Sequence, residues 1–375
     1  MNPGWYSDPW RVGEFRWWDG QAWTAHVATL RGRRHRSRPR LPSWLSVPVL
    51  IGGVVMVPFV VAALIIDPQP VLLTLVPVAI VVPVLLWLDV VEPEPVAGRV
   101  HALLWGATIS IAVAGTVNSV VALTVSESAA AVVSAPLVEE FMKGLGVLVM
   151  VRRREVDGVI DGLVYAGWVG LGFAMVENVE YFVAASDDGV LAETFVARAL
   201  LTPFAHPLFT VWIGWSVGRA VLRGRPVGRA ALTGGVAAVA LHAAWNGSLV
   251  AAGSSDDGVL LILLSASVFV GIFIATVVMV TLVRRADQRR YVRGVGPVML
   301  RYGVSPGVVP ITASWRELRA LRGSLSRSQR RAFDRRRAAL ARLVALHERR
   351  QPIDPVDEAR LLVHLADATR GGPRP

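Results

Sequence analysis

The chain of 375 residues has no cysteine and few charged residues. Without cysteine it has no disulfide, no thiolate metal site and no cysteine nucleophile. A cleavable signal peptide is not expected either, because the first thirty residues are polar and rich in tryptophan. Charged residues make up only 18% of the chain and hydrophobic residues 53%, and the hydrophobic residues recur in long blocks. This pattern indicates a protein that crosses a membrane several times.

Lysine is nearly absent as well. Of the 39 basic residues, 38 are arginine, and the single lysine is Lys143. A lysine ammonium is a compact charge with three donors, whereas a guanidinium is a wide planar fork, so the two are not interchangeable in a tight polar pocket. Because Lys143 stands beside Glu139 and Glu140, we predict that it orients these acids or compensates their charge.

The apolar blocks predict an all-α polytopic membrane protein with eight transmembrane helices. Their approximate bounds are 42–66, 69–90, 99–125, 128–151, 159–184, 193–222, 229–252 and 259–283. Each block is close to the length that a helix needs to cross a bilayer, at a rise of about 1.5 Å per residue. The whole chain then divides into an N-terminal module (1–30), a basic linker (31–41), a transmembrane domain (42–283) and a cytoplasmic basic tail (284–375).

Arginine gathers in segments that fall on one side of the membrane if all eight helices cross. These segments are 31–40, 152–154, 219–229 and the cluster from residue 284 onward, whereas the opposite connections contain neither arginine nor lysine. The positive-inside rule therefore predicts a cell-membrane protein with both termini in the cytoplasm. The acidic loop 91–95 lies on that side too, where it counts little in the rule. This topology accounts for most of the net charge of +11. The lipid bilayer is therefore the expected partner, and nucleic acid is not expected.

The N-terminal module carries five tryptophans within residues 3–27. Asp19-Gly20 separates two runs rich in aromatic and β-favouring residues, which predicts a β-hairpin. The segment resembles a short tryptophan-rich domain of unknown function that is common at the N-termini of bacterial membrane proteins. Two interpretations stay open. The tryptophans form the core of a small sheet, or they dock an unknown partner or the lipid interface.

The tail is expected to be helical and rich in arginine. Phe333, Leu340, Leu343 and Val344 share one helical face among many arginines, and Asp354-Pro355 has the pattern of a helix start. A basic amphipathic helix beside a membrane most often rests on anionic lipid or on a neighbouring helix. Binding of a cytoplasmic partner or of nucleic acid by this tail is the alternative.

Polar residues stand inside four consecutive predicted spans. They are Glu139, Glu140 and Lys143 in 128–151, Glu177 and Asn178 in 159–184, His206 in 193–222, and His242 and Asn246 in 229–252. A charged residue at the middle of a bilayer costs about 2.5 to 3.5 kcal/mol or more. Singly, such residues are explained by a neutralised ion pair, a packing histidine or an interhelical hydrogen bond. Because they occur at compatible depths, we interpret them as one functional site that opens toward the outer half of the membrane.

Four motifs follow one another in this region: E-E-x-x-K at 139–143, D-G-L-V-Y-A-G-W-V-G-L-G-F-A-M-V-E-N at 161–178, His206 with Gly214, and H-A-A-W-N at 242–246. Together they resemble the PrsW family of bacterial intramembrane proteases, which belongs to a superfamily with the CAAX prenyl endopeptidases. The resemblance is best from about 135 to 250. It implies an intramembrane endopeptidase whose protease-like domain, 42–283, hydrolyses peptide bonds of membrane-anchored protein substrates.

The resemblance also implies roles for single residues. The first glutamate of the pair, Glu139, is implied as the base that activates water, although the sequence does not separate it from Glu140. The family has been described both as metalloproteases and, by analogy, as metal-free glutamate proteases. The superfamily often has histidine where this chain has Glu177, which leaves the role of Glu177 open.

Two versions of the chemistry fit these residues. In the metal-free version Glu139 is the general base, His206 positions water or protonates the leaving amine, and His242 with Asn246 stabilises the oxyanion. In the metal version Glu139 stays the base, and zinc is bound by His206, His242 and Glu177. The candidate catalytic residues are therefore Glu139, Glu140, Glu177, His206, His242 and Asn246, with Lys143 and Asn178 in support.

Two other functions compete with proteolysis. Acids and histidines on several membrane helices also serve transporters and proton relays, although the chain has no visible inverted repeat of the kind that many transporters have. A non-catalytic membrane scaffold would use the tryptophan-rich module and the arginine-rich tail to bind partners.

Overall fold

The computed structural model describes residues 4–7, 9, 15–28, 46–89, 93–253, 258–302, 315–348, 358, 361–362 and 365. The chain separates into two compact units. One consists of Arg40–Asp89 and Glu94–Arg284, and the other of Met1–Pro39, Val90–Pro93 and Arg285–Pro375. The first unit contains the apolar helices, and the second contains a small sheet and the basic tail.

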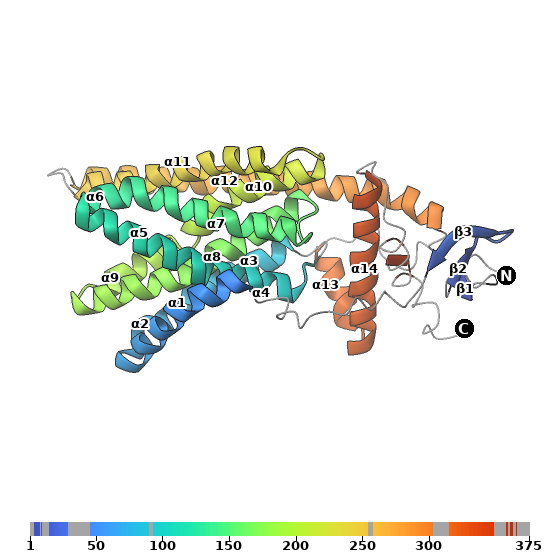
Figure 1. Cartoon of the computed structure of the whole chain (residues 1–375), viewed down its shortest axis with the longest axis horizontal. Coiled ribbons are helices and arrows are strands. Elements are labelled where there is room, and N and C mark those ends of the chain that lie inside the picture. Colours follow the sequence, from blue (N-terminus) through green and yellow to red (C-terminus); the bar gives the residue numbers. More distant parts are fainter. Residues whose placement is uncertain are drawn as a thin grey trace. The chain divides into compact units, whose positions relative to one another are not determined.

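The first unit is a bundle of long helices (Figure 1). Its N-terminal half contains α1 (Val47–Ile66), α2 (Pro68–Leu73), α3 (Leu75–Leu88), α4 (Val96–Trp105), the π-helical turn η1 (Gly106–Ser110) and α5 (Ile111–Thr124). The middle contains α6 (Glu127–Ala129), π-helical η2 (Ala130–Ser134), α7 (Ala135–Arg152) and α8 (Val159–Asp187). There follow α9 (Leu191–Phe195), π-helical η3 (Val196–Leu201), α10 (Ala205–Leu222), α11 (Val227–Gly253) and α12 (Gly258–Tyr302), of which α12 continues into the second unit.

Seven of the eight predicted spans coincide with helical segments that are long and apolar enough to cross a membrane. Within the described residues these segments are Val47–Ile66, Pro68–Leu88, Val96–Thr124, Val159–Asp187, Leu191–Leu222, Val227–Gly253 and Leu260–Tyr302. The predicted span 128–151 is also helical, through η2 and α7. It is not one of the seven, because Glu139, Glu140 and Lys143 lower its apolar character. The all-α membrane fold is thus confirmed, with seven candidate spans in place of eight.

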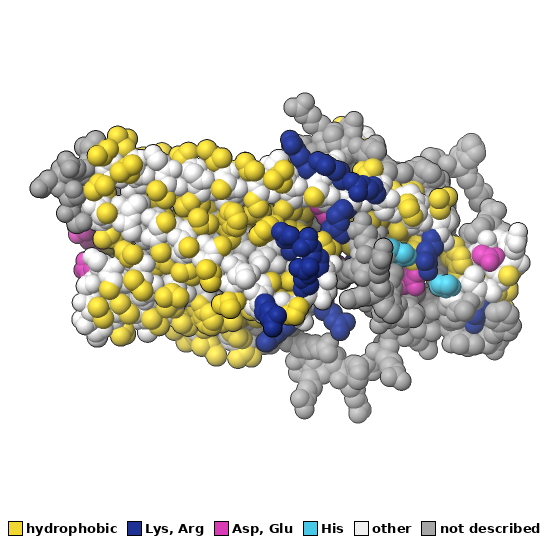
Figure 2. Space-filling view, turned by 90° about the horizontal axis from the view of Figure 1, so that it is seen from above, with side chains coloured by type: hydrophobic (Ala, Val, Ile, Leu, Met, Phe, Trp, Pro, Cys, Tyr) yellow, Lys and Arg dark blue, Asp and Glu magenta, His cyan; other side chains and the backbone are white. Residues whose placement is uncertain are grey.

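Basic side chains are distributed unevenly along the surface of the bundle. Figure 2 shows an apolar surface over most of its length and a band of arginine side chains at one end of it. This distribution is the one that a membrane protein with positively charged loops on one side requires. Which side is the cytoplasm stays a prediction, and so does the location of both termini.

Helix α8 is the centre of the bundle. In its most apolar stretch 83% of the residues are buried, against 17% in α11. Glycines allow α8 to touch its neighbours through the backbone: a Cβ at Gly214 of α10 would lie 2.1 Å from the carbonyl oxygen of Gly162, and one at Gly172 would lie 1.9 Å from that of Leu103. Small residues that let backbones approach are typical of helix contacts in membranes. The contact at Gly214 holds α8 and α10, which carry Glu177 and His206, close together, and the contact at Gly172 holds α8 against α4.

The Gly214→Ala variant is therefore expected to be less stable than the wild type. The added methyl group meets backbone atoms that cannot turn away, and overpacking of this kind costs about 1 to 3 kcal/mol or more. The thermal midpoint of the purified protein in detergent should fall. Gly235→Ala is the matched control, since a Cβ at Gly235 has no neighbour within 4 Å. An equal midpoint for both variants would contradict the close contact between α8 and α10.

The N-terminal module is a three-stranded antiparallel sheet, which is one strand more than the predicted hairpin. Its strands β1 (Gly4–Ser7), β2 (Phe15–Trp18) and β3 (Trp23–Ala28) lie in the order β1–β2–β3. The predicted turn is present between β2 and β3. Asp19 Oδ1 accepts hydrogen bonds from the backbone N–H of Ala22 at 2.7 Å and of Gln21 at 2.8 Å, and these bonds hold the pKa of Asp19 below its usual value. Gly20 has a φ of +105°, which favours glycine.

Aromatic side chains of the sheet contact one another at Trp23. The rings of Trp18 and Trp23 pack edge to face with centroids 5.2 Å apart, and Tyr6 packs on Trp23 at 6.1 Å. These contacts favour the interpretation in which the aromatic residues are the core of the sheet. Trp10 lies outside the described residues.

The basic tail has its own apolar core. The helices α13 (Trp315–Ser324) and α14 (Arg327–Glu348) follow α12. The four residues of the predicted apolar face on α14 are buried, and Leu340, Leu343 and Val344 form a cluster with Val298 and Met299 of α12. The apolar face of α14 therefore rests on a neighbouring helix. The predicted helix start at Asp354-Pro355 lies outside the described residues.

Candidate functional site

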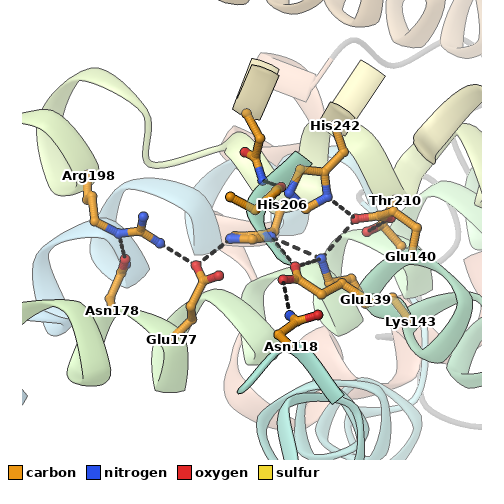
Figure 3. Close-up of polar contacts among 12 residues, drawn as sticks. Asn118, Glu139, Glu140, Lys143, Glu177, Asn178, Arg198, His206, Thr210 and His242 are labelled. Atoms are coloured by element: carbon orange, nitrogen blue, oxygen red, sulfur yellow. Dashed lines mark hydrogen bonds and ion pairs between the residues drawn. The ribbon is translucent and has the colours of Figure 1, made fainter. Parts of the chain in front are cut away.

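Helix α7 brings two acids and a lysine to the interior of the bundle. Glu139, Glu140 and Lys143 are buried, and Lys143 has no exposed surface. Lys143 Nζ donates to Glu139 Oε2 at 3.1 Å and to Glu140 Oε1 at 2.8 Å. Residues three and four positions apart share a face of a helix, so the E-E-x-x-K motif forms one ion cluster (Figure 3).

The two glutamates differ in their surroundings. Glu140 accepts from three side chains: Lys143 at 2.8 Å, Thr210 Oγ1 at 2.9 Å and His242 Nδ1 at 3.2 Å. Glu139 accepts from Lys143 and has a longer contact of 3.4 Å with Asn118 Nδ2. Glu140 is thus enclosed by donors, whereas Glu139 keeps capacity to accept another hydrogen bond.

His206 of α10 connects this cluster to Glu177 of α8. Its Nε2 lies 2.7 Å from Glu177 Oε2, and its Nδ1 lies 3.0 Å from Lys143 Nζ and 3.8 Å from Glu139 Oε2. A lysine ammonium can only donate, so Nδ1 is the acceptor and Nε2 carries the proton that it donates to Glu177. The ring of Phe173 packs against the imidazole of His206, with the two ring centroids 5.1 Å apart.

His242 of α11 has a matching arrangement. Its Nδ1 lies 3.2 Å from Glu140 Oε1, so that Nδ1 donates to the carboxylate and Nε2 keeps a lone pair. Its ring stacks on Phe209 with centroids 4.7 Å apart. Each histidine therefore donates one ring N–H to a glutamate, Glu140 or Glu177. The other nitrogen of His242 keeps its lone pair, whereas that of His206 accepts from Lys143.

The structure places Asn246 and Asn178 at the edge of the cluster. Asn246 Nδ2 donates to the carbonyl oxygen of Ala131 at 2.9 Å, so this amide N–H ties α11 to η2. Asn178 Oδ1 accepts from Arg198 Nε at 2.8 Å. The amide has a second N–H and Asn246 lines the cavity, so the role of Asn246 as an oxyanion donor stays a prediction.

Three further members of the network were not among the predicted site residues. They are Asn118 of α5, Arg198 of η3 and Thr210 of α10. Arg198 donates to Glu177 and Asn178, and Asn118 accepts from Ser134 Oγ at 2.8 Å while it contacts Glu139. A signal for them exists in the sequence, since an asparagine and an arginine inside apolar runs need partners.

The connected ionic groups do not balance in charge. Glu139, Glu140 and Glu177 are three carboxylates, and Lys143 and Arg198 are two cations. With neutral histidines one negative charge is left, in a part of the protein where an uncompensated charge is expensive. The cluster therefore has room for one more positive charge, carried by a proton or by a bound metal ion.

A cavity of about 850 Å³ adjoins the cluster. Glu139, Glu177, His206 and His242 line it, whereas Glu140 and Lys143 lie behind its wall. The cavity extends along α5 and α8 to Glu127, which is exposed. It thus opens toward the end of the bundle that carries α6, the end predicted to face outward.

Apolar residues form the sides of this cavity. Leu201 of η3, Leu249 of α11 and Ile262 of α12 all line it, and they are 67%, 44% and 59% exposed. In a bilayer these residues face lipid. The cavity is therefore bounded by polar groups at its inner end and reaches the lipid-facing surface on its side.

The chemistry of the donor set fits a zinc ion. Ligand atoms of Glu139, His206 and His242 lie within 4.8 Å of one another, and two nitrogens with one oxygen form a common catalytic zinc set. Each histidine donates its other N–H to a carboxylate, which is the usual support of a metal-binding histidine. The geometry favours Glu139 as third ligand over the predicted Glu177, because Glu177 is engaged by Arg198 and by the proton-bearing nitrogen of His206.

Sequence comparison places these residues in a known context. Residues 94–287 match the PrsW family intramembrane metalloprotease, and residues 3–36 match the domain of unknown function DUF2510. Protease PrsW of Geobacillus kaustophilus is 38% identical over 135 residues, which are 35% of this chain and 58% of that protein. Protease PrsW of Clostridioides difficile is 26% identical over 132 residues, 34% of this chain and 55% of that protein. No solved structure matches the chain.

The match covers the helices that form the site. The chain spans 58% and 55% of the length of these two relatives, and the family match covers more than half of the chain, from just before α4 into α12. Every side chain of the buried ionic cluster lies inside this range. A polytopic helical bundle with a buried Glu, His and Lys cluster, matched over this length, belongs to the PrsW family of intramembrane metalloproteases.

Proposed function

We propose that the chain is an intramembrane endopeptidase that hydrolyses a peptide bond in a membrane-anchored protein substrate. The observation that carries this proposal is the position of Glu139. It is the member of the acid pair that reaches the cavity, and His206 and His242 converge on the same place. The Protease PrsW relatives and the family match support the same activity.

The substrate class follows from the walls of the cavity. The apolar sides reach the lipid-facing surface at η3, α11 and α12, while the polar end holds the ionizable residues. An apolar chain segment can enter such a cavity from the bilayer, and its peptide bond then meets the polar groups at the inner end. A single membrane-spanning segment has this composition.

Glu139 is the general base in this proposal. Amide hydrolysis needs an activated water, a stabilised oxyanion and a proton for the leaving amine. Glu139 faces the cavity and takes the proton from water. Lys143, at 3.1 Å from Glu139 Oε2, keeps the carboxylate oriented. Asn118 limits its rotation from the other side through the contact of 3.4 Å with Oε1.

The histidines act next to Glu139. In the alternative to a base at Glu139, a metal ion held by Glu139, His206 and His242 would supply Lewis acidity toward the substrate carbonyl and would lower the pKa of a bound water. The chain itself holds His206 with its Nε2 proton on Glu177 and His242 with its Nδ1 proton on Glu140. The Nε2 lone pair of His242 therefore stays available at the cavity, whereas Nδ1 of His206 accepts from Lys143 and would bind a metal ion only in place of that bond. Glu140 and Glu177 thus support the histidines and are not bases in this scheme.

The purified protein is expected to contain about one zinc ion per chain. Elemental analysis by mass spectrometry measures it. His206→Ala and His242→Ala should lose most of the zinc, whereas His347→Ala should keep it, because His347 lies in α14 beside Tyr302. Full cleavage activity in wild-type protein that holds no metal would remove the zinc version and leave the metal-free one.

Cleavage in a defined membrane tests the proposed activity. The protein is placed in liposomes with a labelled single-span protein, and the fragments are separated by size. The same liposomes carry a pH-sensitive dye inside, which reports proton movement. Proton flux without fragments would favour the transporter or relay, and neither signal would favour the scaffold.

A further inference from the structure

Arg198 is held rigidly at the edge of the cavity. It lies on η3, in the predicted sixth span, and its side chain is 24% exposed. Its Nε donates to Asn178 Oδ1 at 2.8 Å, its terminal nitrogen donates to Glu177 Oε2, and its guanidinium lies 3.6 Å from the centre of the Tyr181 ring. Glu177, Asn178 and Tyr181 all lie on α8, so three contacts bind η3 to one helix.

These three contacts fix the position and the plane of the Arg198 guanidinium. An arginine in an apolar run is retained only when partners compensate its charge, and a guanidinium forms a planar fork that fixes its acceptors in direction as well as distance. The bond from Nε to Asn178 sets the plane of the fork. The second arm then determines where the Glu177 carboxylate lies.

Glu177 receives two donors on the same oxygen. Oε2 accepts from Arg198 and from His206 Nε2, the latter at 2.7 Å. The position of this oxygen therefore sets the orientation of the imidazole and the nitrogen that carries its proton. Arg198 itself does not contact His206 in this arrangement and reaches it only through Glu177.

We propose that Arg198 is a positioning residue, which by clamping Glu177 holds His206 in one ring orientation, with Nε2–H on Glu177 and Nδ1 accepting from Lys143 beside Glu139. This inference rests on the proposed function, because it assigns Arg198 to the site of peptide-bond hydrolysis. The competing role is direct contact: the remaining N–H groups of Arg198, which lines the cavity, would bind the substrate backbone.

A double-mutant cycle separates the two roles. Arg198→Gln, Glu177→Gln and the double variant are compared in the cleavage assay at several substrate concentrations. A positioning residue lowers kcat by roughly 10- to 100-fold, the usual effect of losing a supporting partner of a site histidine, and changes KM by less than about twofold. The double variant should be no slower than Glu177→Gln alone, because both changes break the same link.

The conservative variant adds a second test. Arg198→Lys keeps the charge and loses the fork, so it should recover only part of the rate. If Arg198 contacts the substrate instead, KM rises with kcat nearly unchanged, and the losses from Arg198→Gln and Glu177→Gln multiply. Either of these results would overturn the positioning role.

A measurement without substrate distinguishes this inference from the proteolytic function. Nitrogen NMR of ¹⁵N-histidine-labelled protein in bilayers reports each ring, with His206 assigned by its absence in His206→Ala. The wild type should give one His206 ring state with the proton on Nε2, and Arg198→Gln should give a second state or a broadened signal. Thermal midpoints confirm that each variant is folded, and Arg198→Lys replaces Arg198→Gln if the latter does not fold.

The outcomes of the two experiments are distinct. A shifted His206 signal in a protein that cleaves no substrate would retain the clamp and reject the protease. An unchanged His206 signal in Arg198→Gln, with cleavage by the wild type, would reject the clamp and retain the protease.

Discussion

Replacement of Glu139 by glutamine is expected to lower the rate of peptide-bond cleavage by about 10²- to 10⁴-fold, the range that a general base contributes. Glutamine keeps the shape of the side chain and cannot take a proton from water. Because Glu139 accepts from Lys143 and Asn118 alone among the residues that the structure describes, the amide leaves few buried groups without a partner. The folded protein should therefore persist. Cleavage of a reconstituted single-span substrate measures the rate.

Glu140→Gln is the matched control for this prediction. Glu140 accepts from Lys143, Thr210 and His242 and lies behind the wall of the cavity. Loss of the Glu140 charge should mainly lower the thermal midpoint and weaken the hydrogen bond that orients His242. If Glu140→Gln were stable and inactive while Glu139→Gln kept its rate, Glu140 would be the base and the assignment of Glu139 would be wrong.

The zinc content of Glu139→Gln adds a distinction that the rate alone does not give. A variant that loses cleavage and keeps zinc identifies Glu139 as a base that does not bind the metal. A variant that loses both identifies it as a ligand, in agreement with the distances among Glu139, His206 and His242.

Replacement of Lys143 is expected to have the second largest effect. Lys143→Met leaves Glu139 and Glu140 buried without their shared cation, and breaking a buried pair in this way costs about 3 to 5 kcal/mol. The thermal midpoint should fall steeply, and cleavage should be lost with it. Unfolding in detergent, followed by circular dichroism, measures the change.

Lys143→Arg separates charge from shape. The ammonium is fully buried, contacts both glutamates and His206, and lies 4.0 Å from the centre of the Phe173 ring. A guanidinium is too wide for this space, so overpacking of about 1 to 3 kcal/mol and a displaced Glu139 are expected. Wild-type stability and activity in Lys143→Arg would contradict the idea that the site requires the one lysine of the chain.

Much of this site could be predicted from the sequence because its polar residues lie within apolar segments. Glu139, His206 and His242 stand out in apolar helices, where a polar group needs a partner. Successive residues on a helix differ in direction by about 100°, so the cavity-facing member of the acid pair depends on how α7 is rotated. Packing against α8, α10 and α11 sets that rotation, and no local pattern reports it.

The residues that escaped prediction are those whose partners come from distant segments. Arg198 stands in a predicted apolar span, and its function as a partner of Glu177 depends on η3 lying beside α8. Asn118 reaches Glu139 from α5, which is 21 positions earlier in the chain. A metal-binding role for Glu177 is predicted because its type suits zinc, and the bond to Arg198 that argues against this role is visible only in three dimensions.

The fold was predicted to a similar extent. Length and apolarity predicted the helices, since these properties act locally. The acids of α7 make its span the exception among the eight. The third strand of the N-terminal sheet escaped prediction because β1, with only four residues, is defined by its pairing with β2.

The most direct test of the central claim is the intact mass of a reconstituted single-span substrate after incubation with the wild type and with Glu139→Gln. We expect two complementary fragments from the wild type, produced by a cut within the half of the membrane segment that faces the α6 end of the bundle. With Glu139→Gln that is folded as well as the wild type, the substrate should stay uncut. The same fragments from Glu139→Gln, or a cut outside the membrane segment, would contradict hydrolysis at the buried Glu139 site.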